Sequence, residues 1–590
     1  MEKEIVEERK YDLEIWKKTY KYLKVFNKQF IQIVFCMLFI ASIDVAVPYM
    51  AKYAIDTFII PGTISGLNQF IVIYIIMSLM LSVTIYVFIS IAGKVELLIV
   101  HRLRDLSFNK LQKLSLSYFD KNATGWIMAR TTSDIAKIGM SIAWGLVDFF
   151  WGMAMMIGII IVMAIINLKL ALITFSVIPV LIYVSIYFQK KILKEQRNVR
   201  RLNSKITSSF NEGIVGAKTS KTLVREEQNS IEFEELSNDM RETSIRAAIV
   251  NSLYLPIILF VASIGSVLAL NFGGLNVISG AISFGTLVLF INYVIQFFEP
   301  VRELSRIFAE MLSAQAALER VLSLIEMDID VVDSKESIKL YGTFSNPNDE
   351  LARIKGDIIF ENVEFEYNKG EAVLKTLNLK IQAGHTVALV GETGSGKSTI
   401  VNLACRFYEP TKGRIYIDGT DYKDLSTHYI HSNLGYVLQS PHLFSGSILD
   451  NIRYGRTQSS FEEVVEVCKL VNAHEFIENL ENGYESEVGE GGSNLSTGQK
   501  QLLSFARAII ANPSIFILDE ATSSIDTETE AKIQKAVEKV LDGRTSFVIA
   551  HRLSTIKNAD RILVVESGVV VEDGTHDSLL KKRGKYYKLY

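Results

Sequence analysis

The strongest chemical signal in the sequence is a glycine-rich stretch that ends in lysine, serine and threonine. It runs from Gly391 to Thr399 in the order Gly-Glu-Thr-Gly-Ser-Gly-Lys-Ser-Thr. The apolar run Val387–Val390 precedes it, and Thr399–Leu403 is typical of the start of a helix. A strand, a glycine loop and a helix N-terminus in this order hold phosphate on backbone N–H groups. The sequence therefore predicts a nucleotide site.

The residue types in this loop have separate tasks in phosphate chemistry. We expect Lys397 to reach the β- and γ-phosphate oxygens of ATP, and Ser398 to bind Mg²⁺. The backbone of the whole loop is expected to surround the phosphates. Its predicted contact residues are Gly391, Glu392, Thr393, Gly394, Ser395, Gly396, Lys397, Ser398 and Thr399.

A second apolar run, Ser514–Leu518, leads into two adjacent carboxylates, Asp519 and Glu520. At the end of a buried strand, and together with a phosphate loop, two carboxylates can have separate roles in nucleotide hydrolysis. We expect Asp519 to hold Mg²⁺, directly or through water, and Glu520 to act as general base on the attacking water. A general base typically contributes about 10²–10⁴ in rate.

The elements that must position this chemistry follow a long apolar region. Runs long enough to cross about 30 Å of hydrocarbon lie near 30–55, 69–93, 141–166, 169–188, 247–271 and 283–299. Asn167-Leu168-Lys169 separates two of them as a tight hairpin. We predict an α-helical membrane domain over 1–326 with six transmembrane helices, a polar linker over 327–356 and an α/β ATPase domain over 357–590.

The distribution of basic residues predicts the orientation. Connections 57–68 and 272–282 hold no Lys or Arg, whereas 94–138 and 190–246 are rich in both. The segment before the first span holds Lys17, Lys18, Lys21, Lys24 and Lys28. The positive-inside bias puts both termini and the two basic connections in the cytoplasm, in a multi-pass protein of the plasma (inner) membrane.

The two basic connections keep helical periodicity, so the membrane helices are expected to continue into the cytoplasm. Breaks near 122–125 and 213–217 are the candidate contacts with the ATPase.

Overall composition excludes several classes. The chain has 62 Lys+Arg and 65 Asp+Glu, so its net charge gives no information about nucleic acid. We expect no nucleic-acid partner, and the apolar spans exclude a soluble ATPase of chromosome or repair type. Its three cysteines, Cys36, Cys405 and Cys468, lie far apart, which argues against a disulfide framework or a metal cluster. The N-terminus shows no pattern of a cleavable signal peptide.

In this order and combination the motifs resemble those of an ATP-binding-cassette (ABC) half-exporter, with 1–326 similar to its membrane domain and 357–590 to its ATPase. Leu495–Gln499 resembles the signature motif. The resemblance implies that Ser496, Gly498 and Gln499 contact ATP held by another cassette. Residues 486–492 resemble the exporter type of segment before the signature rather than that of an importer.

The same resemblance assigns further residues. Gln439 matches the glutamine that links the Mg²⁺ and water site to the membrane helices, so the implied Mg²⁺ ligands are Ser398, Gln439 and Asp519. Tyr367 matches the aromatic residue that stacks on adenine. His551 matches the histidine that contacts the γ-phosphate and supports Glu520, and Ser523–Asp526 matches the loop that crosses the dimer.

The signature implies a dimer, since in this family it lies far from the phosphate loop of its own chain. Thr497 departs from the family pattern, which has glycine there. Because Glu520 and His551 are in place, this combination favours a heterodimer with a second half-transporter over a homodimer.

The cargo is less well defined by the sequence. Asp44, Asp148, Gln296 and Glu299 are polar residues within or beside the spans, where such groups usually face a cavity or a partner. We expect export of drugs or other amphiphilic small molecules across the plasma membrane by alternating access, with Asp44 or Glu299 as candidate contacts to cationic amphiphiles. Helix–helix pairing or a gate is the alternative role of these residues. A lipid or peptide translocator and an ATP-gated channel or regulator remain alternatives.

Overall fold

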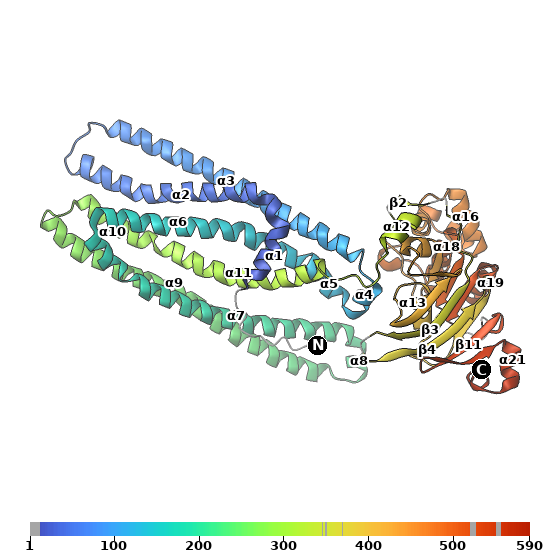
Figure 1. The fold of residues 1–590 in the computed structure, drawn as a ribbon. Coiled ribbons are helices and arrows are strands. Elements are labelled where there is room, and N and C mark those ends of the chain that lie inside the picture. Colours follow the sequence, from blue (N-terminus) through green and yellow to red (C-terminus); the bar gives the residue numbers. More distant parts are fainter. Residues whose placement is uncertain (1–11, 345, 349–350, 368–369, 520–526, 550–555) are drawn as a thin grey trace. The chain divides into compact units, whose positions relative to one another are not determined.

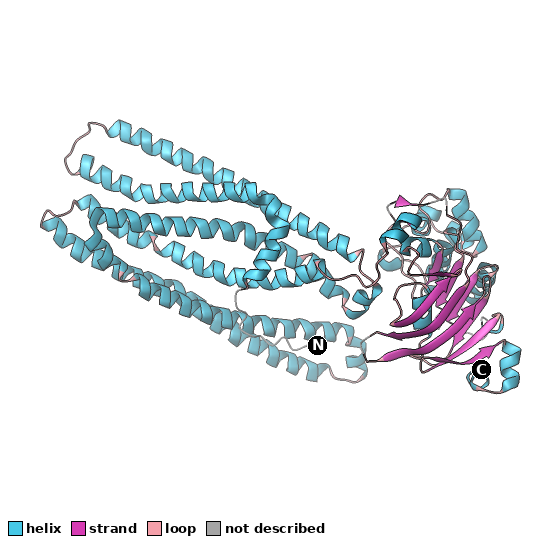
Figure 2. Cartoon of the chain, in the orientation of Figure 1, coloured by secondary structure: helices cyan, strands magenta, loops and turns pink. Residues whose placement is uncertain are grey.

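The computed structural model describes residues 12–590 except 345, 349–350, 368–369, 520–526 and 550–555. The chain divides into two compact units. The helical unit comprises Met1–Gln112 and Thr124–Met327, and the α/β unit comprises Lys113–Ala123 and Asp328–Tyr590. Figure 2 shows that all the strands of the main sheets belong to the α/β unit.

Long helices make up the helical unit (Figure 1). They are α1 (Leu13–Leu23), α2 (Asn27–Ala54), α3 (Leu67–Leu111), α5 (Thr124–Thr131), α6 (Ser133–Phe175), α7 (Ile178–Val215), α8 (Ala217–Thr222), α9 (Glu226–Ile278), α10 (Phe284–Gln296) and α11 (Phe298–Ile325). Several of them far exceed the length that a bilayer requires, about 20 residues.

Five helical stretches in the described part of the chain are long and apolar enough to cross a membrane, by length and composition. They are Leu13–Ile59, Leu67–Leu111, Thr124–Phe175, Glu226–Ile278 and Phe284–Ile325. The predicted run 169–188 is not a helix of its own, because a turn at Ser176 and Val177 divides it between α6 and α7.

The predicted hairpin coincides with a break inside α6. Asn167 has non-helical backbone angles (φ −157°, ψ 96°), and its Oδ1 accepts a hydrogen bond from the Leu170 N–H at 2.9 Å. The asparagine therefore caps the helical piece that follows. The sequence located this connection, but the run after it forms two helical pieces instead of one.

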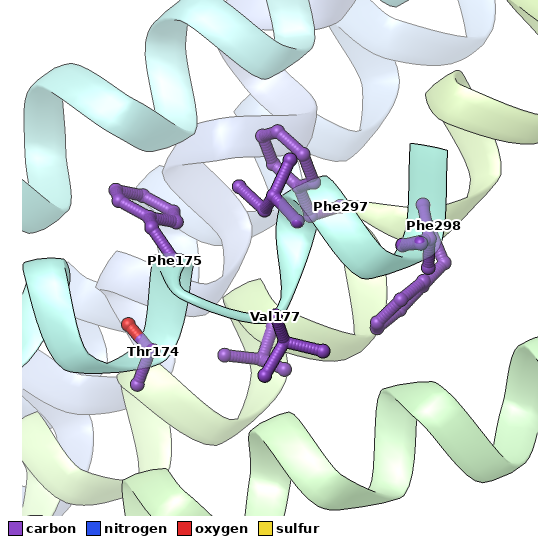
Figure 3. Close-up of a pocket in the computed structure, with 8 residues that line it drawn as sticks. Thr174, Phe175, Val177, Phe297 and Phe298 are labelled. Carbon is purple, nitrogen blue, oxygen red and sulfur yellow. The ribbon is translucent and has the colours of Figure 1, made fainter. Parts of the chain in front are cut away.

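Two apolar clusters hold the helical unit together. One joins α1 and the first half of α2 to α3, α6 and α11, through Ile33, Ile99 and Ile135 among others. The other joins the second half of α2 to α6, α7, α9 and α10. At the turn between α6 and α7 a cavity of about 20 Å³ lies among Phe175, Val177 and Phe297 (Figure 3).

The α/β unit contains two main sheets. A six-stranded sheet has the order β12-β11-β5-β10-β9-β8, and a four-stranded antiparallel sheet has the order β4-β3-β6-β7. The strands are β3 (Ile358–Glu366), β4 (Ala372–Ile381), β5 (Thr386–Val390), β6 (Lys412–Ile417), β7 (Thr420–Asp421), β8 (Leu434–Val437), β9 (Ile515–Asp519), β10 (Thr545–Ile549), β11 (Arg561–Glu566) and β12 (Val569–Gly574). In the larger sheet all strands but β12 are parallel.

Helices cover both faces of the larger sheet, because alternate residues of each strand point to opposite sides. In β9, Ile515 and Ile517 join one apolar cluster, whereas Phe516 and Leu518 join the other. The first cluster contains α13 (Lys397–Ala404) and the small sheet. The second contains α15 (Ile448–Arg453), α16 (Phe461–Leu470), α18 (Thr497–Ile510) and α19 (Thr527–Leu541).

The remaining short elements of the α/β unit are α4 (Leu116–Lys121), α12 (Lys335–Tyr341), α14 (Thr427–Ser432), α17 (His474–Glu478), α21 (His576–Lys582), α22 (Lys585–Leu589) and the pair β1 (Gly342–Thr343) and β2 (Asn346–Pro347). The stretch 327–356 is therefore not only a polar linker. Ser334 starts α12 as its N-cap, with its side chain accepting from the Ser337 N–H at 3.0 Å.

Candidate nucleotide site

The glycine loop joins the end of β5 to the start of α13, as the sequence predicts. Gly391 and Gly396 have φ of +149° and +106°, values that side chains rarely adopt. A Cβ on Gly391 would lie 2.1 Å from the Val565 carbonyl O, and one on Gly396 would lie 2.9 Å from Leu374 Cδ2. Glycine is therefore required at both positions for the loop to pass close to β11 and β4.

Lys397 is buried in this loop. Its Nζ donates to the carbonyl oxygens of Gly391 at 2.8 Å and Glu392 at 2.7 Å. Burial lowers the pKa of the Lys397 ammonium, and the nearby Asp519 carboxylate opposes this shift. The positive charge of Lys397 is thus held inside the loop. A bound anion would stabilise this charge and offset the cost of its burial.

Two further observations fit a phosphate group. The buried Ser395 hydroxyl has no hydrogen-bond partner among the described residues, and a buried polar group without a partner is costly. The N-cap of α13 is Gly396, which offers no side chain to the first N–H groups of the helix. Both the hydroxyl and these N–H groups are donors of the kind that bind phosphate at a helix N-terminus.

Strand register brings the predicted Mg²⁺ ligands to the same edge of the sheet. Val437 of β8 pairs with Leu518 of β9, so Asp519 and Gln439 both follow at the carboxyl ends of neighbouring strands. Gln439 and Ser398 are exposed. No group of three His, Cys, Asp or Glu that could hold a metal occurs within the described residues.

This donor set fits Mg²⁺. Hydroxyl, amide and carboxylate oxygens are the ligands that this ion accepts, with its remaining positions filled by water and phosphate. Ser398, Gln439 and Asp519 would hold it at the edge of the sheet.

Several predicted residues lie outside the described residues. They are Glu520, the loop Ser523–Asp526 and His551. In the sequence, Glu520 comes directly after the last residue of β9, and His551 is the second residue after β10.

Tyr367, the predicted adenine contact, is part of an aromatic cluster. Its hydroxyl lies 3.2 Å from Thr399 Oγ1 in the phosphate-loop helix. Its ring packs edge-on against Phe365 and Tyr408, with centroids 4.8 Å and 5.2 Å away. The ring is half-buried. One part of it packs against other side chains, and the rest is exposed to solvent or to a ligand.

The signature stretch forms the N-terminus of α18. Ser496 is the N-cap, its Oγ accepts from the Gln499 N–H at 3.3 Å, and Gln499 Oε1 accepts from the Ser496 N–H at 2.9 Å. This reciprocal pair is a capping box. Gly498 is buried, whereas Ser496 and the unusual Thr497 are exposed.

The phosphate loop and the signature lie on helices that cover opposite faces of one sheet. Ile400 and Leu403 of α13 pack in the cluster on one face, and Leu503 and Phe505 of α18 pack in the cluster on the other. The fold therefore assigns the two motifs to different sides of the sheet.

The structure adds a contact surface that sequence motifs did not reveal. Helix α4, which precedes the predicted break at 122–125, belongs to the α/β unit. The Tyr408 hydroxyl donates to Asp120 of α4, and Ser115 and Ser117 donate to Asp330. Burial and the Asp120 charge both raise the pKa of Tyr408. The second predicted tip, α8, belongs to the helical unit.

Asp333 extends the same surface to the start of α14 and to the residue that follows the C-cap of α13. Its carboxylate accepts from Thr427 N–H at 3.0 Å and from the fully buried Arg406 at 3.1 Å. Asp330 and Asp333 thus connect the segment after α11 to both α4 and the nucleotide domain. No spacing rule links Tyr408 to Asp120, because the pair is 288 residues apart.

Comparison with known proteins agrees with these features. Residues 30–301 match the ABC transporter transmembrane region, and residues 374–523 match the ABC transporter family. An uncharacterized ABC transporter ATP-binding protein, YfiC of Bacillus subtilis, is 38% identical over 92% of this chain and 88% of its own length. The ATP-dependent lipid A-core flippase of Syntrophus aciditrophicus is 34% identical, over 98% and 94%.

A solved structure is similar over almost the whole length. It is a bacterial Atm1-family ABC exporter with ATP bound, with a TM-score of 0.78, 26% identity and coverage of 96% of this chain and 98% of that chain. The fold is therefore shared with a solved ABC exporter.

Proposed function

The chain belongs to the ABC transporter family, as an exporter that couples an ATPase domain to a membrane domain, and from this premise we propose that it exports drugs or other amphiphilic small molecules. Transport proceeds by alternating access across the plasma membrane, with both termini in the cytoplasm. The basic connections of the membrane domain support this orientation.

One observation in the helical unit carries the proposal for the cargo. Arg306 of α11 lies between three carboxylates, Asp148 of α6 at 2.7 Å, Glu303 at 2.7 Å and Glu310 at 2.6 Å. Arg302 pairs with Glu299 at 3.5 Å and with Glu303. Four carboxylates therefore face two guanidinium groups, an excess that favours a cation.

Apolar side chains surround this charged cluster on the same helices. Phe149 of α6 and Phe308 of α11 are exposed, so a charged surface and apolar surface lie within one or two turns of each other. A molecule with a cationic group and an apolar body matches both. We therefore assign Glu299 and Glu303 as candidate cargo contacts.

Asp44 and Gln296 have a different environment. Asp44 Oδ2 accepts from the Trp151 indole N–H at 2.9 Å, and the Asp44 carbonyl accepts from Gln296 Nε2 at 3.1 Å. These bonds connect α2 to α6 and α10, which favours a role in helix packing over cargo binding.

The placement of α13 and α18 on opposite faces supports an assembly of two chains. The phosphate loop and Tyr367 of one chain would face the signature of another, so that each of two sites uses both chains. Thr497 in place of glycine favours a heterodimer, in which this chain supplies the catalytic base and the partner supplies an unaltered signature.

We assign the catalytic roles from position and chemistry. Glu520 is the general base, His551 contacts the γ-phosphate and Gln439 positions the attacking water. Lys397, Ser395 and the loop N–H groups hold phosphate. Mg²⁺, held by Ser398, Asp519 and Gln439, would neutralise developing charge on the phosphates.

A transport assay in sealed vesicles tests the proposed cargo. The Glu299→Gln/Glu303→Gln variant should raise the KM for a cationic dye by about fivefold, a partly exposed ion pair being worth at most about 1 kcal/mol. Transport of a neutral dye should be unchanged. Glu242→Gln is the matched control, because Glu242 also pairs with an arginine, at 3.7 Å, and is similarly exposed. Equal effects on both dyes would contradict charge recognition.

A lipid translocator is the second candidate, because the similar flippase from Syntrophus aciditrophicus is named for lipid A-core. The same vesicles with a fluorescent phospholipid distinguish the two, since a flippase moves the lipid between leaflets at the expense of ATP. Uphill movement of either cargo would exclude a channel.

A further inference from the structure

A cavity of the helical unit lies beside α1. Its volume is about 840 Å³, within the range of pockets that enclose a small-molecule ligand. It is lined from four helices by residues that include Trp16 and Leu23 of α1, Phe30 of α2, Phe149 and Phe150 of α6 and Phe308 of α11. No residue that lines it is charged.

Most of the polar groups of the lining lie on one side, and Ser141 of α6 is the exception. The Asn27 amide donates to the Tyr20 hydroxyl at 2.7 Å, and the Thr19 hydroxyl donates to the Ile15 carbonyl at 2.8 Å. All three side chains belong to α1 or to the first turn of α2. The pocket therefore has an apolar interior and a polar rim formed by α1.

Lysines flank this rim. Trp16, Thr19, Tyr20 and Leu23 follow helical spacing and face the pocket, while Lys17, Lys21 and Lys24 follow the same spacing on the adjacent side. All three lysines are exposed, and no ion pair of theirs occurs among the described residues. A helix with one apolar and one basic face, just before a membrane span, lies in the membrane interface.

The opposite side of α11 carries the carboxylates. Glu299, Glu303, Arg306 and Glu310 recur every three or four residues, and Phe308 with Met311 lies between them on another side of the helix. The pocket thus has positive charge at its rim, whereas the cluster proposed for cargo has an excess of negative charge. Phe149 and Phe308 belong to both surfaces, so the two differ in the charge that lies beside them and not in these apolar side chains.

From this combination we propose that the pocket binds an acyl chain of an anionic membrane phospholipid, with α1 as its cover and Lys17, Lys21 and Lys24 as contacts to the phosphate headgroup. The apolar lining matches the acyl chain, and the exposed lysines match the negative charge of the headgroup. This site does not depend on which cargo the protein exports.

Quenching of Trp16 by brominated lipid tests the proposal on the full-length chain in bilayers. The Trp16 signal is the difference between the wild type and Trp16→Phe, which removes the contributions of Trp126, Trp144 and Trp151. We expect half-maximal quenching by dibrominated phosphatidylglycerol at a mole fraction about tenfold lower than by dibrominated phosphatidylcholine.

Two variants separate the acyl chain from the headgroup. Gly145 lines the pocket, and the nearest atom to a Cβ there is Ile307 Cγ2 at 4.0 Å, so Gly145→Leu fills the cavity and should abolish the selective quenching. Gly93→Leu is the control, since a Cβ on Gly93 meets nothing within 4 Å. The exposed triple change of Lys17, Lys21 and Lys24 to Gln should reduce the preference for phosphatidylglycerol to about twofold.

Three results would overturn the proposal. Equal quenching by the two lipids would exclude headgroup selection. Unchanged quenching in Gly145→Leu would place the acyl chain elsewhere. An absence of quenching, together with a cysteine cross-link from Phe149→Cys to a second chain, would show that a protein partner covers the pocket.

Discussion

The phosphate loop and the signature share one local arrangement. In each, a turn with glycines precedes a helix N-terminus, and a lysine near the start of the helix donates a hydrogen bond to a carbonyl of the turn. Lys397 donates to the Gly391 and Glu392 carbonyls, and Lys500 donates to the Gly491 carbonyl at 3.1 Å. They differ at the N-cap. Gly396 leaves the first N–H groups of α13 without a side-chain partner, whereas Ser496 caps α18 within its own chain.

This difference agrees with the proposal that one domain carries two half-sites. The uncapped N–H groups of α13 are free to bind the phosphates that its own chain holds. In α18 the Gln499 N–H is already bonded to the Ser496 side chain, and the helix presents an exposed serine and the positive end of its dipole. The opposite faces that these helices cover agree with contributions to two different sites.

Loss of the catalytic base should have the largest effect. Glu520→Gln should lower ATP turnover of the assembled transporter by about 10²–10³, the contribution expected of a general base, while ATP binding is retained. Turnover and binding of radiolabelled ATP are measured on the same sample. If the equivalent change in a partner chain were equally damaging, the two sites would not differ as proposed.

The two lysines provide a direct contrast between the helix N-termini. Lys397→Ala should weaken ATP binding to this chain by about 10- to 100-fold, because hydrogen bonds to charged groups contribute about 1.5–3 kcal/mol. Lys500→Ala should leave binding within about twofold. Equal losses of affinity in a fluorescent ATP titration would place both lysines in one site.

Restoring glycine to the signature should improve a site formed by two copies of this chain. We expect Thr497→Gly to raise the turnover of the purified single chain by about five- to tenfold, equivalent to about 1 kcal/mol in the barrier. Ser493→Gly, at an exposed position before the signature, is the control. Vigorous turnover of the unaltered chain alone would argue against the heterodimer.

The smallest expected effect concerns coupling. Tyr408→Phe removes the bond to Asp120 of α4 while the ring still packs on Tyr367, so cargo-stimulated ATPase should fall by about two- to fivefold, as for one hydrogen bond. Basal ATPase should be unchanged. Tyr416→Phe is the control, because the Tyr416 hydroxyl also donates to a carboxylate, Glu361, at 3.1 Å. A loss of basal activity instead would assign Tyr408 to nucleotide binding.

The sequence predicted the nucleotide half of the molecule well because each motif there depends on its neighbours in the chain. The strand before Gly391, the strand before Asp519 and the helix after Ser496 are all present. Gly391 and Gly396 belong to a strand–loop–helix motif with fixed glycine spacing, which a sequence pattern can represent.

Features that depend on contacts between residues far apart in the chain were harder to predict from the sequence. The break at Ser176 and Val177 interrupts an apolar run, so hydropathy alone does not reveal it, although Pro179 in the first turn of α7 is a signal for a helix start. The assignment of α4 to the α/β unit depends on Tyr408 and Asp330, which lie far along the chain. The pocket beside α1 requires four helices at once, and no local pattern predicts such an arrangement.

The most direct test of two half-sites is a measurement of ATP affinity beside turnover in a Ser496→Asp variant. Aspartate is as good an N-cap as serine, so α18 should remain intact, and Ser460→Asp at the equally built cap of α16 is the control. The account predicts unchanged ATP affinity of the chain that carries the change, with turnover of the assembled transporter about 10- to 100-fold lower, since the new charge faces phosphate held by the partner. A parallel loss of ATP affinity in the same chain would contradict it.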